Sequence, residues 1–332
     1  MATETRKTVS VPEQIAEKLN LSVSTVYAIL ADRKSCFASQ KLKQKVKKLA
    51  QELGYRPNYI AVSLKTGKIG TIGFVVSDMH IETTIYRLES ITQHALGDRY
   101  NVFIGISYDN EAMEEELLQE FYYRRVDGIA IVPARNSHEN NFLRRLVEMK
   151  FPLMSFAPIE NLDIDYVSVD YFSGGYMAGK HLLDMGYTKP GFLSPVMDTI
   201  SIQQRFEGFS KALADNGCRL DESRVIFISE EKLLETDIDA VFGFNDRAAL
   251  IFMKKALEKG KKKIPQDLGV IGFDDTEAGR LSLIPLTSVK QKLPETTAHL
   301  YSMLRKKMQG DNQSCRLLIE PELIARESTK RR

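Results

Sequence analysis

Short apolar segments rich in β-branched residues alternate with helical stretches through most of the chain. A first series comprises Gly70–Val76, Val102–Ile106, Gly128–Val132, Leu153–Phe156 and Val167–Val169, with an amphipathic stretch from Thr84 to Leu96 after its first member. A second series comprises Gly191–Leu193, Val225–Ile228, Ala240–Phe244 and Gly269–Phe273. Such alternation is typical of parallel sheets covered by helices on both faces. We therefore expect an α/β core of two doubly wound subdomains, which bind ligands at the carboxyl ends of their strands.

The charge of the chain is split between its first 68 residues and the rest. This head holds 13 Lys and Arg against 5 Asp and Glu, whereas the remaining 264 residues hold 33 against 39. The overall charge of +2 hides this division. A basic head on an acidic body indicates a polyanionic partner for the head alone. Charge by itself is equally compatible with a solvated, Lys-rich helix that binds nothing.

The pattern inside the head predicts a small all-α helix-turn-helix unit. Ser10-Val11-Pro12-Glu13 is a capping box that begins a first helix, and Asn20-Leu21 makes the turn. Ser22 caps a second helix from Val23 to about Ala31. A third helix runs from about Ser39 to Leu53, with five Lys on its outer face, at positions 41, 43, 45, 47 and 48. A generic helical bundle gives the same periodicity, but turn, caps and basic face together favour DNA binding.

The second helix of such a motif enters the major groove with its N-terminal side chains leading. Val23 and Ser24 would then read bases, with Ala28 one turn later, and Thr25 would lie near phosphates together with the Lys of the third helix. The residues of this segment that we expect to contact DNA are Ser22, Val23, Ser24, Thr25, Tyr27 and Ala28. One unit contacts too little DNA for useful affinity, so we expect a homodimer on a near-palindromic double-stranded operator.

Residues 58–68 predict a hinge between head and core. Arg56-Pro57 ends the third helix, and Asn58 can cap one or two turns that reach about Leu64. So short a helix is marginal alone, and it would be ordered only against DNA. An exposed Leu64 could act as a wedge in the minor groove, with Asn58, Ala61 and Lys65 beside it on the DNA. The alternative is an ordinary linker with an incidental Leu.

Several sequence signals for other classes are missing. There is no apolar leader, no apolar run long enough to span a membrane, no Walker loop, no GxGxxG and no Ser nucleophile elbow. The three Cys are far apart, and the five His show no ligand spacing. We therefore expect a cytoplasmic protein, associated with the nucleoid when bound to DNA, without catalytic residues, metal or cofactor. Asp274-Asp275 could alternatively be a carboxylate pair for acid–base work.

Polar side chains at the predicted strand ends point to a ligand site. Arg205 is predicted to begin a helix after Pro195–Ser201, Asn245-Asp246 follows one strand, and Asp274 follows another. Carboxylates, a carboxamide and a guanidinium at one mouth can bind vicinal hydroxyls, and the rings of Phe244 and Phe273 can stack on a sugar. The alternative is that Asn245 and Asp246 only cap the next helix. Gly174-Gly175 is predicted to serve a tight strand-to-helix turn.

Several motifs, in order, resemble one family. Ile15–Val26, Glu52–Asn58 and the spacing to Leu64-Lys65 look like the headpiece and hinge helix of the lactose-repressor/purine-repressor (LacI/GalR) family. The likeness continues through Gly174–Gly179, Arg205–Phe209, Asn245-Asp246, Gly272–Asp275 and Pro285–Val289, and so covers nearly the whole chain. The resemblance implies a periplasmic-binding-protein-like core with three crossovers, an effector between its subdomains, and effector contacts at Arg205, Asn245 and Asp274.

The implied organisation has four parts. The headpiece comprises residues 1–57 and the hinge and linker 58–68; the N-terminal core subdomain comprises 69–168 with 292–320, and the C-terminal subdomain 169–291 with 321–332. The chain departs from the family pattern at four places, which are Tyr27-Ala28, Ala157, the short stretch 229–237, and residues 77–86 without their usual aromatic pair. These departures leave the operator, the effector and the retention of an effector response open.

We therefore expect a sequence-specific DNA-binding regulator, a repressor in most of the resembling family, modulated by a small molecule of the sugar class. The alternative is a soluble sugar-binding protein or a sugar-converting enzyme with an incidental helical head. The charge of the head and the hinge favour the regulator. Whether the effector would act as inducer or corepressor is not encoded in any of these motifs.

Overall fold

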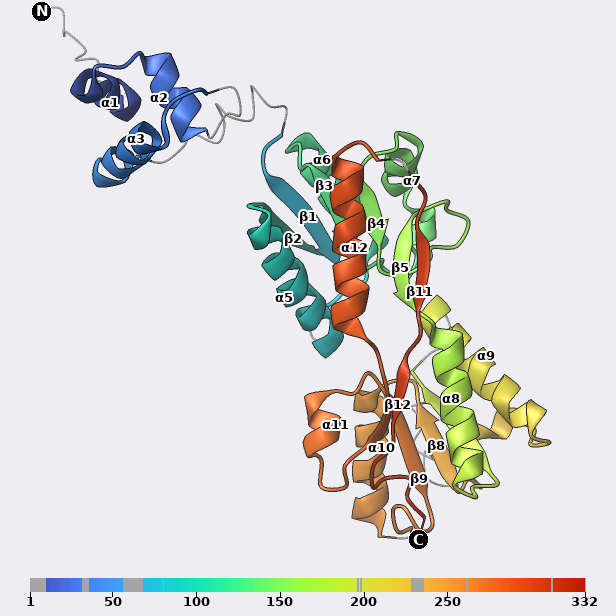
Figure 1. Cartoon of the computed structure of the whole chain (residues 1–332). Coiled ribbons are helices and arrows are strands. Elements are labelled where there is room, and N and C mark those ends of the chain that lie inside the picture. The colour runs from blue at the N-terminus through green and yellow to red at the C-terminus, as the bar shows by residue number, and fades with distance from the viewer. Residues whose placement is uncertain are drawn as a thin grey trace, which may run out of the picture. The chain divides into compact units, whose positions relative to one another are not determined.

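The structure, a computed structural model, describes residues 10–31, 36–55, 68–79, 81–195, 197, 199–227, 236–260, 262–311 and 313–331. The chain divides into two compact units, a headpiece of residues 1–69 and a core of residues 70–332 (Figure 1). No described helix is long and apolar enough to cross a membrane.

Three short helices form the headpiece, as the sequence predicts. They are α1 (Val11–Leu19), α2 (Val23–Leu30) and α3 (Gln40–Glu52). The Glu13 carboxylate accepts a 2.7 Å hydrogen bond from the Ser10 backbone N–H at the start of α1, and Asn20 ends this helix in the left-handed conformation, with φ of 54°. Ile15, Val26, Ile29 and Val46 are buried and hold the three helices together.

The first sheet of the core is entirely parallel. Its order is β11-β5-β4-β3-β1-β2. The strands are β1 (Thr71–Val76), β2 (Asn101–Ile106), β3 (Gly128–Ile131), β4 (Leu153–Ser155), β5 (Tyr166–Val169) and β11 (Arg316–Ile319). Successive residues of β1 point to opposite faces, so Phe74 joins a core under one helix layer and Val75 joins the core on the other face.

Helices cover both faces of this sheet. The helices α5 (Glu82–Gly97) and α12 (Leu293–Met308) pack on the side of Phe74, where Figure 1 shows them next to each other. The helices α6 (Glu111–Tyr123) and α7 (Asn141–Glu148) pack on the side of Val75. A short 3₁₀ turn, Ser137–Glu139, precedes α7.

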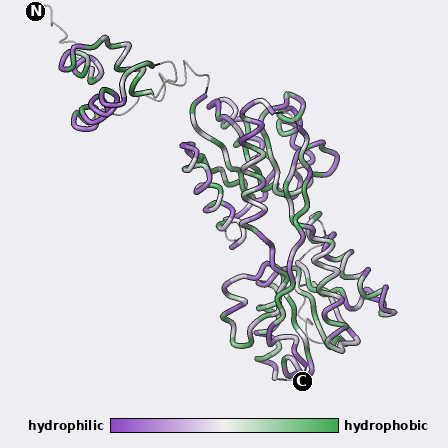
Figure 2. Tube along the Cα trace, in the orientation of Figure 1, coloured by the Kyte–Doolittle hydropathy of each residue, from purple (hydrophilic) through white to green (hydrophobic). Residues whose placement is uncertain are grey.

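The second sheet repeats this plan, with one antiparallel edge strand. Its order is β12-β10-β9-β8-β6-β7, and β12 alone runs antiparallel to its neighbour. The strands are β6 (Pro190–Ser194), β7 (Val225–Phe227), β8 (Ala240–Gly243), β9 (Gly269–Phe273), β10 (Thr287–Lys290) and β12 (Glu322–Ile324). A 3₁₀ turn, Glu222–Arg224, leads into β7. Figure 2 shows the strands of both sheets as largely hydrophobic.

Two helices cover one face of the second sheet and two lie on the other side. The helices α8 (Tyr171–Asp184) and α9 (Ile200–Asp215) enclose a core with Phe209, Phe242 and Phe273. The helix α10 (Asp246–Lys259) packs Phe252 on the opposite face, with the short α11 (Glu277–Leu281) beside it. The doubly wound fold predicted from the sequence is thus confirmed in both halves of the core.

The chain passes between the two sheets three times. It leaves the first sheet after β5 for α8, returns after β10 into α12, and leaves again between β11 and β12. The strands β10, β11 and β12 were not named by the sequence analysis. The stretch 229–237, predicted to be too short for a full helix, lies mostly outside the described residues.

Two glycines have a different role from the one predicted. Gly174 and Gly175 do not form a turn between strand and helix, because both lie inside α8 and are buried. A Cβ on Gly175 would lie 2.0 Å from the backbone oxygen of Arg205, and a Cβ on Gly208 of α9 would lie 1.9 Å from that of Phe172. These glycines therefore let α8 and α9 approach each other at backbone contact distance.

Candidate functional site

The N-terminus of α2 presents small and exposed side chains. The Ser22 hydroxyl accepts a 3.1 Å hydrogen bond from the Thr25 backbone N–H and lies 2.8 Å from the hydroxyls of both Ser24 and Thr25. Because Val26 and Ile29 face the headpiece core, Val23 and Tyr27 face outward, with 37% and 44% of their surfaces exposed. The outer face of α2 is therefore free to contact a ligand over Val23, Ser24 and Tyr27, whereas Ala28 is half-buried.

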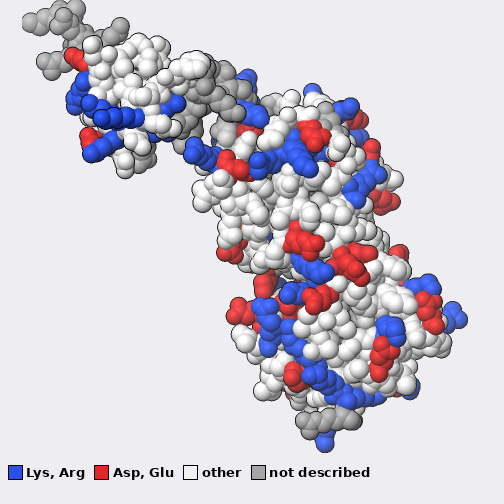
Figure 3. All heavy atoms as spheres, in the orientation of Figure 1, with Lys and Arg blue, Asp and Glu red and all other residues white. Residues whose placement is uncertain are grey.

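The third helix places positive charge on the same small unit. Lys41, Lys45, Lys47 and Lys48 are exposed and Lys43 is half-buried. Figure 3 shows Lys and Arg side chains gathered on the visible face of the headpiece. The geometry supports the expected pairing of a readout helix with a phosphate-binding helix. The predicted hinge contacts Asn58, Ala61, Leu64 and Lys65 lie outside the described residues and stay predictions.

A cavity of about 470 Å³ lies between the two sheets of the core. Its wall is built by segments that follow the carboxyl ends of strands from both sheets, as expected for doubly wound sheets. From the first sheet come residues 77–78, 132–138 and 156–160, and from the second come Pro195, Phe244, Asn245, Asp274 and Gln291. The helices α5 and α9 add Arg87 and Arg205.

Arg205 is buried in this wall against aromatic rings. It lies in the second turn of α9, which begins at Ile200, so the prediction that Arg205 begins the helix is wrong by one turn. Its guanidinium carbon lies 3.8 Å from the ring centroid of Phe273 and 4.8 Å from that of Tyr171. Its Nη1 donates to the backbone oxygen of Phe244. Burial lowers the pKa of Arg205, and the neighbouring Asp274 opposes this shift.

Asp274 and Gln291 form the polar floor of the cavity. Asp274 adopts a φ of 117° directly after β9, and its backbone N–H donates to Val289 on β10. The Gln291 side chain donates a 2.5 Å hydrogen bond to the Asp274 carboxylate. Burial raises the pKa of Asp274, while Arg205 lowers it.

Arg87 was missed by the sequence analysis. It lies on the buried face of α5, donates a 3.1 Å hydrogen bond to the Gln291 side-chain oxygen, and stacks 5.2 Å from the ring centroid of Phe156. Arg87, Gln291 and Asp274 thus form a chain of contacts from one half of the core to the other. A signal existed in the sequence, because Arg87 falls on the same helical face as Thr84 and Ile91, where a charge is costly without a partner.

Asn245 and Phe244 both lie at the cavity. The Asn245 side chain accepts a 2.9 Å hydrogen bond from the Ala248 backbone N–H, so it caps α10 while it also lines the cavity. The capping alternative and the ligand prediction are therefore compatible. Ala157, which has no polar side chain, also lines the cavity.

Two predicted ligand residues are buried away from the cavity. The ring of Phe273 is 0% exposed and lies under the Arg205 guanidinium, so the prediction that it stacks on a ligand is wrong. Asp246 is also 0% exposed. Its carboxylate accepts from the Ser288 hydroxyl at 2.6 Å and from the Thr276 N–H at 2.7 Å, and burial raises its pKa to about 7. Asp246 therefore holds the strand ends in place instead of contacting a ligand.

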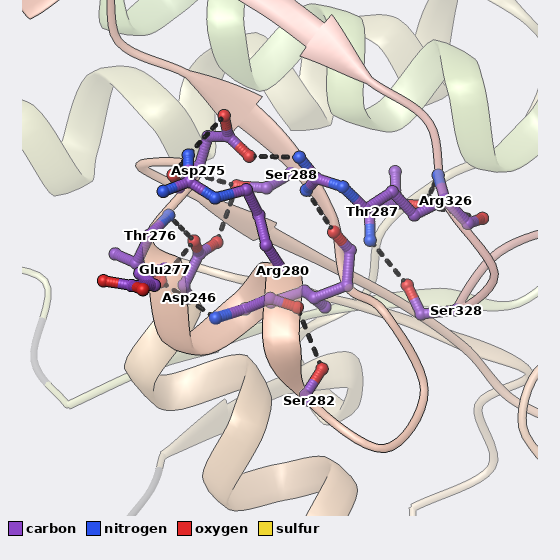
Figure 4. A network of polar contacts seen from close by, with 12 residues as sticks. Asp246, Asp275, Thr276, Glu277, Arg280, Ser282, Thr287, Ser288, Arg326 and Ser328 are labelled. Carbon is purple, nitrogen blue, oxygen red and sulfur yellow. Dashed lines mark hydrogen bonds and ion pairs between the residues drawn. The ribbon is translucent and has the colours of Figure 1, made fainter.

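A wider polar network surrounds Asp246 (Figure 4). The Asp275 carboxylate forms a 2.5 Å ion pair with Arg326 and a 3.6 Å ion pair with Arg280. The Ser328 hydroxyl accepts from the Thr287 backbone N–H at 2.8 Å. The network fastens the segment after β12 to the start of β10, which gives Asp275 a structural role. Among the described residues there is also no cluster of His, Cys, Asp and Glu that could hold a metal.

Comparison with known proteins identifies relatives along the whole chain. Residues 180–329 match the family described as a periplasmic binding protein-like domain. The HTH-type transcriptional repressor PurR of Pasteurella multocida is 27% identical over 96% of this chain and 98% of its own length. The HTH-type transcriptional regulator DegA of Bacillus subtilis is 28% identical over 95% of this chain and 96% of its own length.

Solved structures share the fold. The lac repressor dimer bound to operator and the anti-inducer ONPF matches with a TM-score of 0.84 at 21% identity, over 97% of this chain and 99% of its own. The transcriptional regulator CelR in complex with cellobiose matches with a TM-score of 0.71 at 22% identity, over 96% and 99%. These relatives are regulators, which agrees with the expectation that the chain is not an enzyme. The chain is thus similar, along nearly its whole length, to repressors and regulators of the LacI/GalR type.

Proposed function

We propose that the protein is a homodimeric repressor that binds a near-palindromic DNA operator through its headpieces and responds to a small molecule in the core cavity. The observation that carries the DNA-binding part is the outer face of α2. Its capped N-terminus exposes Val23 and Ser24 beside the Lys-rich α3, which are the two elements that base readout and phosphate contact require.

Exposed apolar side chains on the core support a dimer. They occur on α5, on the edge strand β2 and around α11, and Figure 1 shows these elements along one side of the core. The residues are Ile85, Tyr86, Leu96, Phe103, Ile104, Leu281 and Leu283. Leu283 is 90% exposed, and an uncovered edge strand with Phe103 and Ile104 is prone to associate. Burial of this face in a two-fold dimer places two headpieces on one operator.

The hinge completes the DNA-binding unit. Residues 58–65 are proposed to form a short helix against the minor groove, where Asn58, Ala61 and Lys65 contact DNA and Leu64 enters between base pairs. Unstacking of the base pairs costs a few kcal/mol, and the additional contacts that a bent duplex allows offset this cost. Because so short a helix does not persist alone, a small change in the separation of its two copies is expected to control DNA affinity.

The chemistry of the cavity favours a polyhydroxylated effector. Arg205, Asn245 and Asp274 lie on its wall, and a carboxylate, a carboxamide and a guanidinium together bind vicinal hydroxyls. Phe244 offers an aromatic surface beside them. CelR, whose fold this chain shares, is described in complex with cellobiose, which supports a carbohydrate-class effector here.

Contacts between the two halves of the core supply a means of coupling. The Glu82 carboxylate of α5 accepts a 3.0 Å hydrogen bond from the Glu277 backbone N–H at the start of α11, and Arg87 contacts Gln291. A ligand bound between the two halves of the core either competes with these contacts or reinforces them. It shifts the equilibrium between two relative positions of the halves only by the difference in its affinity for those two positions.

Selection of genomic DNA fragments by the purified protein, with and without a metabolite extract, tests this function. We expect enrichment of a near-palindromic sequence, and an affinity that falls by about 10³- to 10⁵-fold between 50 and 200 mM salt if six to ten phosphates are contacted. Sedimentation should show a dimer. Equal affinity for every duplex, or binding that ignores salt, would contradict the proposal.

A further inference from the structure

Two arginines are buried in the wall of the cavity, one from each half of the core. Arg87 comes from α5 and Arg205 from α9, and each is only 6% exposed. The Nε–H group of each side chain is buried and has no hydrogen-bond partner. A buried N–H group of a charged side chain without a partner is unfavourable, so each guanidinium group has donor capacity that no described residue uses.

The inner part of the cavity has more positive than negative charge. Asp274 is the carboxylate that acts on both arginines, and one of its oxygens already accepts from Gln291. Asp246 lies deeper, with its carboxylate fully occupied by Ser288 and Thr276. Arg87 and Arg205, both buried, therefore share Asp274 as the carboxylate that interacts with both of them.

The other acids that line the cavity are Asp78, Asp109 and Glu160; Asp78 is half-buried and Glu160 is exposed. Asp109 forms a 3.2 Å ion pair with Arg135, and both side chains are well exposed. Glu82 accepts from the Glu277 backbone. The rings of Phe156, Tyr171 and Phe273 surround the two guanidinium groups with surfaces that give attraction to a cation but accept no strong hydrogen bond. The missing partner of the arginines is thus an acceptor that carries negative charge.

We propose that the effector is an acidic carbohydrate derivative whose phosphate or carboxylate group binds between Arg87 and Arg205. This inference rests on the proposed role of the cavity as an effector site. Phosphate and carboxylate oxygens match the forked donors of guanidinium groups and bind them more strongly than neutral oxygens do. The hydroxyl groups of the same molecule would face Asn245 and Asp274. Since the two arginines belong to different halves of the core, the anion also bridges those halves.

The test measures thermal unfolding of the full-length protein at constant ionic strength. The probes are a set of hexoses, their 6-phosphates, the corresponding aldonic and uronic acids, inorganic phosphate and acetate. We expect at least one acidic member to raise the unfolding temperature while its neutral parent has no effect. The phosphorylated and carboxylated arms show which acidic group is recognised, and calorimetry then gives the affinity of the compound that binds.

Variants of Arg87 identify the subsite. Arg87→Gln removes the positive charge and should lower the affinity for the acidic compound by about 10- to 100-fold. Arg87→Lys keeps the positive charge but lacks the forked donor geometry of a guanidinium group, so it should give an intermediate affinity. It also replaces Arg87→Gln as the test if that variant does not fold. Arg305→Gln is the matched control, because Arg305 is exposed on α12 and pairs with Asp98 outside the cavity. It should bind like the parent.

Three results would overturn the inference: binding of neutral sugars only, an unchanged affinity in Arg87→Gln, or no response to any probe. DNA selection with the parent protein is carried out separately. A protein that selects an operator but shows one of these three results contradicts only the anionic effector, whereas failure to select DNA contradicts the proposed function itself.

Discussion

The contact between α8 and α9 should make Gly208→Ala destabilising, although alanine is the better helix former. A Cβ at Gly208 would lie 1.9 Å from the backbone oxygen of Phe172 and 2.9 Å from the backbone nitrogen of Tyr176. Both atoms belong to a helix backbone, so no side chain can turn aside. The helices must separate by about 1 Å or more, and such overpacking costs about 1–3 kcal/mol. Alanine regains about 1 kcal/mol of helix preference.

We expect a net loss of about 2 kcal/mol in the free energy of unfolding, at the upper end of the overpacking range. With a urea dependence of about 3 kcal/mol per molar, the unfolding midpoint should fall by about 0.7 M. Circular dichroism in urea at one fixed protein concentration measures this. Because Arg205 lies one turn before Gly208 on α9, the same displacement should weaken any ligand that contacts Arg205.

Gly97→Ala is the matched control. Gly97 ends α5, and a Cβ there would meet nothing within 4 Å. This variant should be as stable as the parent or slightly more stable. If Gly208→Ala were at least as stable as Gly97→Ala, the close backbone approach of α8 and α9 would not limit the packing of this subdomain, and our reasoning on the two helices would be refuted.

Leu64→Ala should weaken specific operator binding far more than non-specific binding, as measured by mobility shift on operator and random duplexes; equal affinity of variant and parent would make Leu64 an ordinary linker residue. Exchange of Val23 and Ser24 for larger polar residues should shift the preferred operator in a selection experiment without unfolding the protein, and an unchanged site would mean that α2 docks differently. Ile104→Lys should convert the dimer into monomer in sedimentation, because it places a charge on the apolar edge of β2; a persistent dimer would place the interface elsewhere. Burial lowers the pKa of His181 below its value in the unfolded chain. The contribution of His181 to stability is therefore complete above about pH 6.5 and is lost as the pH falls through the folded pKa. His181→Gln should make the unfolding temperature less dependent on pH between about pH 7 and 5, and an equally steep profile in the variant would exclude His181 as the source of that dependence.

Strands that are buried on both faces gave the clearest signal in the sequence. Gly70–Val76 and Gly269–Phe273 are continuous apolar runs because helices cover both sides of their sheets, and β1 and β9 occupy those residues. The last two strands gave no such signal. β11 and β12 are short edge strands of four and three residues, and exposed or half-buried side chains dominate both. Their pairing is decided by the chain's return from α12, which no local pattern encodes.

The ligand cavity was predictable only to the level of strand ends. Position after a strand brought Asn245 and Asp274 to one cavity, and Arg205 lines the same cavity from the second turn of α9. It did not show which of two adjacent residues faces outward, and Asp246, next to Asn245, turns into the protein toward Ser288. The two-residue alternation of β9 likewise turns Phe273 into the core beneath Arg205.

The last crossing of the chain between the sheets determines how the protein can mature on the ribosome. The helix α12 supplies Leu300 and Leu304 to the core of the first sheet, and β11 and β12 complete the edges of the two sheets. Neither half of the core can therefore be finished before the final fifth of the chain has been translated. The headpiece, which is continuous in sequence, needs none of those residues. Premature termination before α12 would thus release a folded headpiece attached to a core that cannot complete its fold.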